Sequence, residues 1–124
     1  MKLNRENAGP GKQITACEAG AISVNGERFV ASLIVTPEAV LSDWNVSDFA
    51  TLTAEALGGV VALAPALVLI GTGTKQRFPV PAVLRPLIEA GIGFEVMDTA
   101  AACRTYNLLA AEGRKVAAAL VIES

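Results

Sequence analysis

Two short apolar runs constrain the fold of this chain more than any other feature. Residues 67–73 read Leu-Val-Leu-Ile-Gly-Thr-Gly, and residues 93–99 read Gly-Phe-Glu-Val-Met-Asp-Thr. Each run ends in a turn, and the chain between them has the length of one helix, which is typical of a strand-helix-strand unit. Because ligands of open α/β sheets bind at the carboxyl ends of the strands, both runs point to one candidate functional edge.

The composition indicates one domain with an aliphatic core. Of the 124 residues, 52% are hydrophobic and only 5% are aromatic. A chain of this length buries roughly two-thirds of its unfolded surface around a single core. We expect a flexible N-terminal arm over residues 1–13, because this segment is polar and aperiodic, and a single domain over residues 14–124. The arm lacks the apolar region of a secretory signal.

Charge and hydropathy argue against several classes of partner. The net charge of −2 gives no electrostatic reason to expect binding to nucleic acid or to an anionic membrane. The longest apolar stretch, residues 58–71, is interrupted by Pro65 and is shorter than the ~20 residues that span a bilayer, so we expect no membrane insertion. The cysteines, Cys17 and Cys103, are far apart in the sequence and predict free thiols in a reduced, cytoplasmic protein.

Turn residues and periodicity predict the order of the elements. Asn25-Gly26 separates two apolar segments, residues 21–24 and 28–35, and predicts an antiparallel hairpin, to which residues 14–17 are a candidate further strand. The remaining predicted elements are a helix from residue 53, a strand over 67–70, a helix from 81, a strand over 94–96, a helix over 100–111 and a strand over 116–122. The predicted fold is therefore α/β, with three layers, a mixed central sheet, and an N-terminal β-hairpin followed by α-β-α-β-α-β.

The chain contains no histidine, and this absence restricts its possible chemistry. It removes the commonest general base, most zinc sites and the Ser-His and Cys-His nucleophile pairs. Cys103 is interpreted as a packed core residue, because it has neither a His partner nor a C-x-x-C companion. We predict no catalytic residue, no metal and no cofactor.

The turn Gly71-Thr72-Gly73 is the first candidate site. It follows a strand, as phosphate-binding turns do, but it matches neither G-x-G-x-x-G nor G-x-x-x-x-G-K-[ST]. One interpretation is a tight turn in which glycine permits a positive φ and close packing. The other is an anion site built from backbone amides, with help from Thr72, Lys75 and Arg77.

A second polar set follows the neighbouring strand. Glu95 and Asp98 could act as an acid-base pair if burial separated their pKa values. The alternative interpretation makes Asp98 or Thr99 a helix cap and places Glu95 and Arg104 in a structural ion pair. The candidate binding residues at the whole edge are Gly71, Thr72, Gly73, Lys75, Arg77, Glu95, Asp98, Thr99, Arg104 and Asn107.

Several segments together resemble a known family. They are Gly71-Thr72-Gly73, residues 93–99, residues 102–107 and Glu112-Gly113-Arg114. Over about residues 14–122 the chain is similar to the Mth-type domain family of unknown function, whose members include mitochondrial respiratory complex I assembly factor 3 and an adipogenesis-associated protein. The resemblance implies a three-layer α/β fold with a mixed central sheet. It implies no enzyme chemistry, and in mitochondrial relatives it implies scaffolding or chaperoning of membrane-complex assembly.

These observations favour a cytoplasmic, non-enzymatic interaction or assembly factor. We expect it to bind a protein partner through the edge around Gly71–Arg77 and Met97–Asn107. The alternative function is a small-molecule binding protein or enzyme that holds an anionic or nucleotide-like ligand in a pocket at the same edge. The hairpin also leaves an exposed strand edge, through which a homodimer could form.

Overall fold

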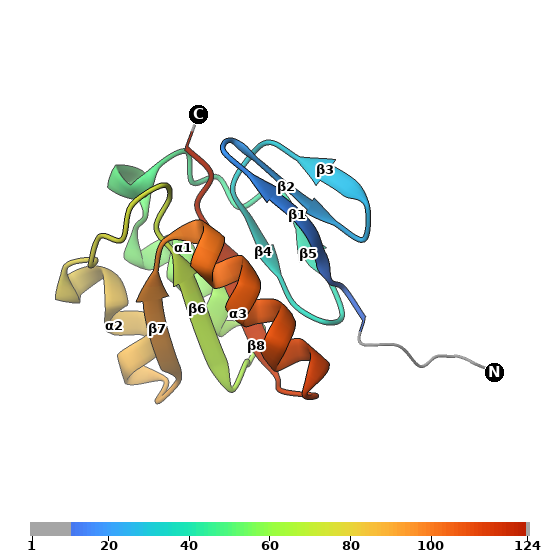
Figure 1. Cartoon of the computed structure of the whole chain (residues 1–124). Helices are drawn as coiled ribbons and strands as arrows, with labels where there is room; N and C mark the ends of the chain where they lie inside the picture. Colours follow the sequence, from blue (N-terminus) through green and yellow to red (C-terminus); the bar gives the residue numbers. More distant parts are fainter. Residues whose placement is uncertain (1–10, 124) are drawn as a thin grey trace.

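The computed structural model describes residues 11–123, which form two β-sheets and three α-helices (Figure 1). The smaller sheet is antiparallel and has the order β1-β2-β3. Its strands are β1 (Ile14–Glu18), β2 (Ala21–Val24) and β3 (Glu27–Phe29). β1 confirms the candidate further strand of the sequence analysis.

The larger sheet is mixed and has the order β5-β4-β8-β6-β7. β6 pairs in parallel with both β8 and β7, whereas β4 pairs antiparallel with β8 and with β5. The strands are β4 (Leu33–Val35), β5 (Val40–Leu41), β6 (Leu67–Gly71), β7 (Gly93–Met97) and β8 (Val116–Leu120). The predicted mixed central sheet is confirmed.

Helices cover both faces of the larger sheet. α3 (Thr99–Ala111) and the smaller sheet lie on one face, and α1 (Ala54–Val61) and α2 (Pro81–Glu89) lie on the other (Figure 1). Successive residues of β6 alternate between the two cores, since Leu69 packs on the α3 side whereas its neighbours Val68 and Ile70 pack on the α1 and α2 side. This alternation explains why the run is wholly apolar, as in strands buried on both faces.

Local signals place the starts of the helices. The Thr53 hydroxyl accepts a hydrogen bond from the Ala56 N–H at 3.2 Å, and the Asp98 carboxylate accepts one from the Ala101 N–H at 2.8 Å. These side chains replace the partners that the first turn of a helix lacks. Pro81 occupies the first turn of α2, where its missing N–H costs nothing. The predicted caps at Thr53 and Asp98 are confirmed.

The second arm of the predicted hairpin needs a correction. Asn25 and Gly26 form the turn, with φ of 50° and 86°, and join β2 to β3 as expected. Residues 28–35, however, are divided between two sheets, because β3 ends at Phe29 and β4 pairs with β8. The physical reason is burial: Leu33–Val35 contributes side chains to both cores, whereas a strand at the edge of the small sheet stays largely exposed. A short 3-10 helix over Phe49–Thr51 was also not predicted.

The predicted arm over residues 1–13 is described only in part. Residues 1–10 lie outside the described residues. Lys12 is bonded to the domain at both backbone groups: its N–H donates to the Pro37 carbonyl at 3.0 Å, and its carbonyl accepts from the Tyr106 hydroxyl at 2.7 Å. The Gln13 N–H donates to the Asn25 side chain at 2.9 Å.

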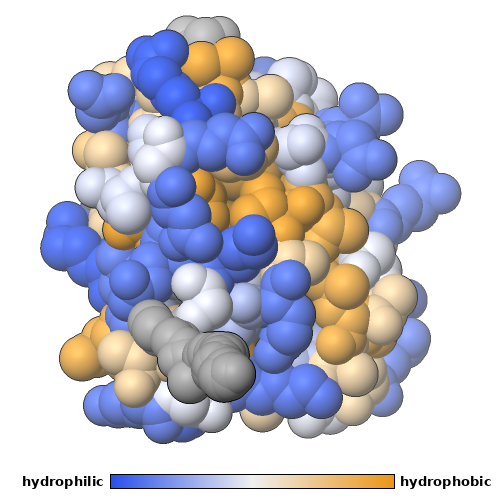
Figure 2. Space-filling view, turned by 90° about the vertical axis from the view of Figure 1, so that its right-hand side faces the viewer, coloured by the Kyte–Doolittle hydropathy of each residue, from blue (hydrophilic) through white to orange (hydrophobic). Residues whose placement is uncertain are grey.

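The surface on the side of the small sheet carries both hydrophobic and hydrophilic residues. Figure 2 shows hydrophobic residues gathered in a strip on this side, with hydrophilic side chains around them. Val30, which follows β3, is 62% exposed. Homodimer formation through the edge of this sheet stays a prediction.

Within residues 11–123, no helix is both long enough and apolar enough to cross a membrane.

Candidate functional site

The ends of β6 and β7 lie side by side, as the sequence predicts. Gly71 is opposite Met97 in the parallel register, and the Thr72 N–H donates to the Met97 carbonyl at 2.9 Å. The next residue after Thr72 also bonds to this segment, since the Gly73 carbonyl accepts from the Thr99 N–H at 2.9 Å. The loop after β6 and the first turn of α3 therefore form one continuous edge.

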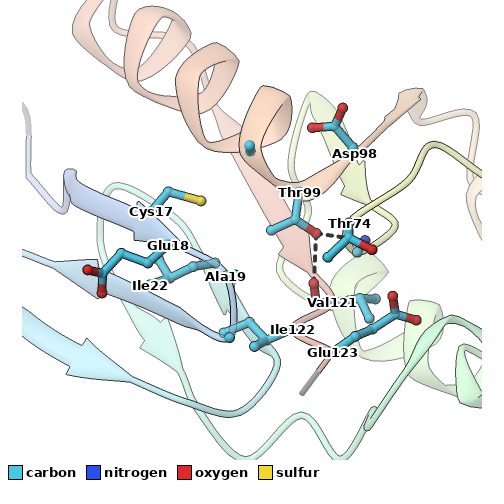
Figure 3. Close-up of a pocket in the computed structure, with 13 residues that line it drawn as sticks. Cys17, Glu18, Ala19, Ile22, Thr74, Asp98, Thr99, Val121, Ile122 and Glu123 are labelled. Carbon is cyan, nitrogen blue, oxygen red and sulfur yellow. Dashed lines mark hydrogen bonds between the residues drawn. The ribbon is translucent and has the colours of Figure 1, made fainter.

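The buried Thr99 hydroxyl joins three segments at this edge. It accepts from the Gly73 N–H at 2.8 Å and donates to the Val121 carbonyl at 2.7 Å, so the end of β6, the start of α3 and the segment after β8 meet there (Figure 3). A Cβ on Gly71 would lie 3.0 Å from the Cα of Thr99. Gly73 has a φ of 100°, and a Cβ there would collide with the Glu123 carboxylate. Both glycines are thus explained by close packing and, at Gly73, by a positive φ.

The backbone amides of this turn already have partners. The N–H of Thr72 donates to Met97 and the N–H of Gly73 donates to Thr99. An anion at these two amides would have to replace hydrogen bonds within the protein. The geometry therefore favours the interpretation as a packed turn over the interpretation as an anion site.

Thr72 also shapes the loop that follows. Its side chain is buried. The Thr72 hydroxyl donates to the Lys75 carbonyl at 2.5 Å and accepts from the Arg77 N–H at 3.1 Å. These contacts hold the base of the loop. The side chains of Thr74, Lys75 and Gln76 are exposed.

An ion pair fixes the end of this loop. Nη2 of Arg77 lies 2.5 Å from Oε1 of Glu123 and donates to the Thr72 carbonyl at 3.0 Å. The guanidinium lies over the Phe49 ring, 5.0 Å from its centroid, a favourable cation-π arrangement. The Phe49 N–H donates to Oε2 of Glu123 at 3.0 Å, and this bond, with the nearby Arg77, holds the pKa of Glu123 below its usual range.

Arg77 is among the residues predicted from the sequence, but its more distant partners Glu123 and Phe49 are not. Glu123 lies near the C-terminus and Phe49 begins a short 3-10 helix, so neither is close to the loop in the sequence. No local pattern marks them, because the contact depends on how distant segments pack.

A cavity of about 250 Å³ lies beside Thr99 (Figure 3). It is smaller than the roughly 300–1,000 Å³ of pockets that hold drug-sized ligands. Of the predicted candidates, Gly73, Asp98 and Thr99 line it. The lining residues that the sequence analysis did not name as site residues are Cys17, Glu18, Ala19, Gly20, Ile22, Thr74, Ala100, Val121, Ile122 and Glu123.

The remaining predicted residues lie outside the lining of this cavity. Glu95 is exposed on the outer strand β7, and Arg104 is exposed on α3. Among the ion pairs of the described residues, none joins Glu95 to Arg104. Asn107 bonds to the backbone of Ile14. A binding role for these residues remains a prediction.

In the part of the chain that the structure describes, the acidic and thiol side chains do not gather as metal ligands would. Within residues 11–123, no group of three or more cysteine, aspartate or glutamate side chains has the arrangement of a metal site. Asp98 accepts from the Ala101 N–H, so one carboxylate oxygen is already engaged as the cap of α3.

A family model matches most of the chain. The match covers residues 14–121, and the family is described as proteins of unknown function, DUF498/DUF598. This chain belongs to the DUF498/DUF598 family. The Mth-type resemblance agrees, since a Bordetella pertussis protein described as a Mth938-like domain is 37% identical with a TM-score of 0.82, covering 98% of this chain and 92% of that one.

Further similar proteins are found among solved structures and among curated sequences. The crystal structure of a Bordetella parapertussis protein is 42% identical, with a TM-score of 0.86, and the match covers 94% of this chain and 99% of the other. Among curated proteins, NADH dehydrogenase [ubiquinone] 1 alpha subcomplex assembly factor 3 of Xenopus tropicalis is 36% identical over 100 residues. That match covers 79% of this chain and 54% of the relative, so this chain spans about half the length of the curated relatives it matches.

Proposed function

We propose that this member of the family is a non-enzymatic assembly factor that acts in the cytoplasm. It binds a protein partner through the edge formed by Gly71–Arg77 and Met97–Asn107, and it assists assembly of an NADH dehydrogenase complex. The relatives named as assembly factors support this role, since the similarity extends over 79% of the chain. The two free thiols support the location, because disulfides are rare in reducing compartments.

The structural observation that carries the proposal is the loop after β6, whose base is held while its tip is exposed. The Thr72 hydroxyl and the Arg77–Glu123 pair hold the base. Lys75 is exposed at the tip, and Phe78, directly after Arg77, is 68% exposed. A held loop loses little conformational entropy on binding, and exposed aromatic residues often supply much of the binding energy of an interface.

Deletion of the gene in the organism that makes this chain tests the role. The readouts are the amount of assembled NADH dehydrogenase on a native gel and the NADH oxidation rate of isolated membranes. We expect both to fall on deletion and to recover with the wild-type gene. An unchanged amount of complex after deletion would contradict the assembly role.

Complementation with variants tests the surface. The double variant Lys75→Glu/Phe78→Ser changes two exposed side chains of the loop and leaves its base intact, so we expect a folded protein that fails to restore the complex. Val30→Ser is the matched control, since Val30 is 62% exposed on the side of the small sheet. Equal rescue by the double variant and by Val30→Ser would place the binding surface elsewhere. The proposal that the protein is non-enzymatic would be contradicted by a catalytic activity of the wild-type protein that is lost in Arg104→Ala.

A further inference from the structure

Cys17 and Cys103 are distant in the sequence but are neighbours in the fold. Cys17 is in β1, Cys103 is in α3, and the side chain of Cys103 is buried in the core that α3 shares with the small sheet. Burial raises the pKa of the Cys103 thiol, and the adjacent Cys17 thiol raises it further. Figure 3 shows the sulfur of Cys17 pointing from β1 toward α3.

An irregularity in β1 turns Cys17 toward the helix. Ile14 is opposite Val24 and Cys17 is opposite Ile22, and the register shifts between these two pairs. In a regular strand, residues three apart point to opposite faces. One extra residue at a bulge restores a common face, and directly opposite residues share a face. Because Ile22 and Val24 are buried in the core that contains Cys103, Cys17 lies on the side that faces α3.

The helix presents Cys103 to the same strand. Asn107 of α3 bonds to the backbone of Ile14, and Cys103 precedes Asn107 by one helical turn on the same side of α3. Further along β1, Cys17 lines a cavity together with Thr99 and Ala100 at the start of α3. β1 therefore runs along α3 in the direction that leads from Asn107 back to Cys103. The bulge and the helical period together bring the two thiols to one place.

The two thiols differ in their access to solvent. Cys17 is exposed and lines the cavity beside Thr99, whereas Cys103 is buried. A reagent in solution can reach Cys17, and Cys103 can be reached through Cys17. An accessible thiol beside a second thiol is the arrangement of an attacking and a resolving cysteine.

We propose that Cys17 and Cys103 form a redox-active thiol pair, which a low-molecular-weight disulfide oxidises to a disulfide joining β1 to α3. The Cys17 thiolate, its proton released to solvent, attacks one sulfur of the small disulfide, and the other sulfur leaves as a thiolate that takes up a proton. The Cys103 sulfur then attacks Sγ of Cys17 and expels the second small thiol, which takes the Cys103 proton. In total, two protein thiols are oxidised and one small disulfide is reduced to two thiols.

Intact-mass spectrometry of the full chain tests the pair. The reduced protein is incubated with oxidised glutathione, sampled over time, and alkylated with N-ethylmaleimide. We expect a transient glutathione adduct on Cys17, followed by a monomer that has lost two hydrogens and takes up no maleimide. The same reaction in concentrated urea is the reference. At a fixed ratio of oxidised to reduced glutathione, we expect the equilibrium constant for closure of the disulfide to be at least about tenfold larger in the folded chain, because folding raises the local concentration of the second thiol.

Two variants identify the role of each sulfur. In Cys103→Ala we expect the glutathione adduct on Cys17 to persist, and in Cys17→Ser we expect neither an adduct nor a disulfide under native conditions. A persistent adduct in the wild-type chain would overturn the proposal, as would an equilibrium constant for closure no larger than in urea. Both of those results come from the wild-type chain, so they stand even if a variant folds poorly.

Discussion

The side-chain amide of Asn107 bonds to both backbone groups of Ile14. Nδ2 donates to the Ile14 carbonyl at 2.7 Å, and Oδ1 accepts from the Ile14 N–H at 2.9 Å. The amide thus takes the place of a neighbouring strand residue, since it offers one donor and one acceptor to the start of β1. This pair ties α3 to the small sheet.

Replacement of Asn107 by Ala should lower the free energy of unfolding by about 1–3 kcal/mol, because two backbone groups of Ile14 lose their partners. Asn107→Asp is the informative comparison, since it keeps the acceptor for the N–H but places a carboxylate oxygen against the Ile14 carbonyl. Urea denaturation followed by circular dichroism measures both. If Asn107→Ala had the wild-type midpoint, the amide would contribute nothing to the attachment of β1.

Thr99→Val should destabilise the fold by about 2 kcal/mol, because the shape of the side chain is preserved while the Gly73 N–H and the Val121 carbonyl lose the hydroxyl. Thr99→Ser retains the hydroxyl and should cost less than Thr99→Val. The denaturation midpoints of the two variants measure this difference, provided that the slopes of their transitions are equal. The reverse order of stability would show that the methyl group, and not the hydroxyl, is the important part of Thr99.

Two glycine-to-alanine changes should alter the free energy of unfolding in opposite directions. In Gly71→Ala the added methyl meets the backbone of Thr99 at 3.0 Å and Cδ2 of Leu120 at 3.2 Å, so we expect a loss of about 1–3 kcal/mol. Gly59, within α1, has nothing within 4 Å of the added carbon. Gly59→Ala should therefore gain about 0.5–1 kcal/mol, since alanine favours the helix. Thermal unfolding of both variants checks the signs, and destabilisation by Gly59→Ala would contradict this account of α1.

Glu123 should make stability depend on pH. The Phe49 N–H and Arg77 hold its pKa below the usual 4.5, so the ionised form is bound more strongly by the folded chain than by the unfolded one. This contribution is present above the pKa of the unfolded chain and is lost as the pH falls through the lower pKa of the folded chain. At pH 7, Glu123→Gln should cost about 1 kcal/mol, a value reduced for the partial exposure of the pair.

Unfolding free energies of wild type and Glu123→Gln across the acid range measure this contribution. We expect the two curves to converge as the pH falls below 4.5. Asp43→Asn, a change of an exposed carboxylate, controls for the loss of one negative charge. A constant difference between wild type and Glu123→Gln at all pH values would show that ionisation of Glu123 is not coupled to folding.

The elements best predicted from sequence are those whose signals are local. Thr53 and Asp98 cap their helices, Asn25-Gly26 turns a hairpin, and β6 is buried on both faces. In each case the responsible residues lie within a few positions of one another. The division of residues 28–35 between two sheets was not predictable in this way, because a run of apolar residues does not specify which strand will pair with it.

The candidate site shows the same limit. The sequence places Gly71, Gly73, Asp98 and Thr99 at one edge, because the ends of parallel neighbouring strands must lie together, and the structure confirms that edge. Only the structure shows that the turn amides are bonded internally and that Glu123 is the partner of Arg77.

The alternation of helices and strands from residue 53 onward, the positions of the caps and the common edge after β6 and β7 were determined by the sequence alone, since they depend on residues close in the chain and on a general rule of α/β topology. The tertiary structure decided that Cys17 faces the helix of Cys103. It also decided that Asn107 bonds to the backbone of β1 and that Glu123 pairs with Arg77 of the loop after β6. These contacts join segments far apart in the chain, so packing of the two sheets against α3 and of the C-terminal segment against the loop selects them.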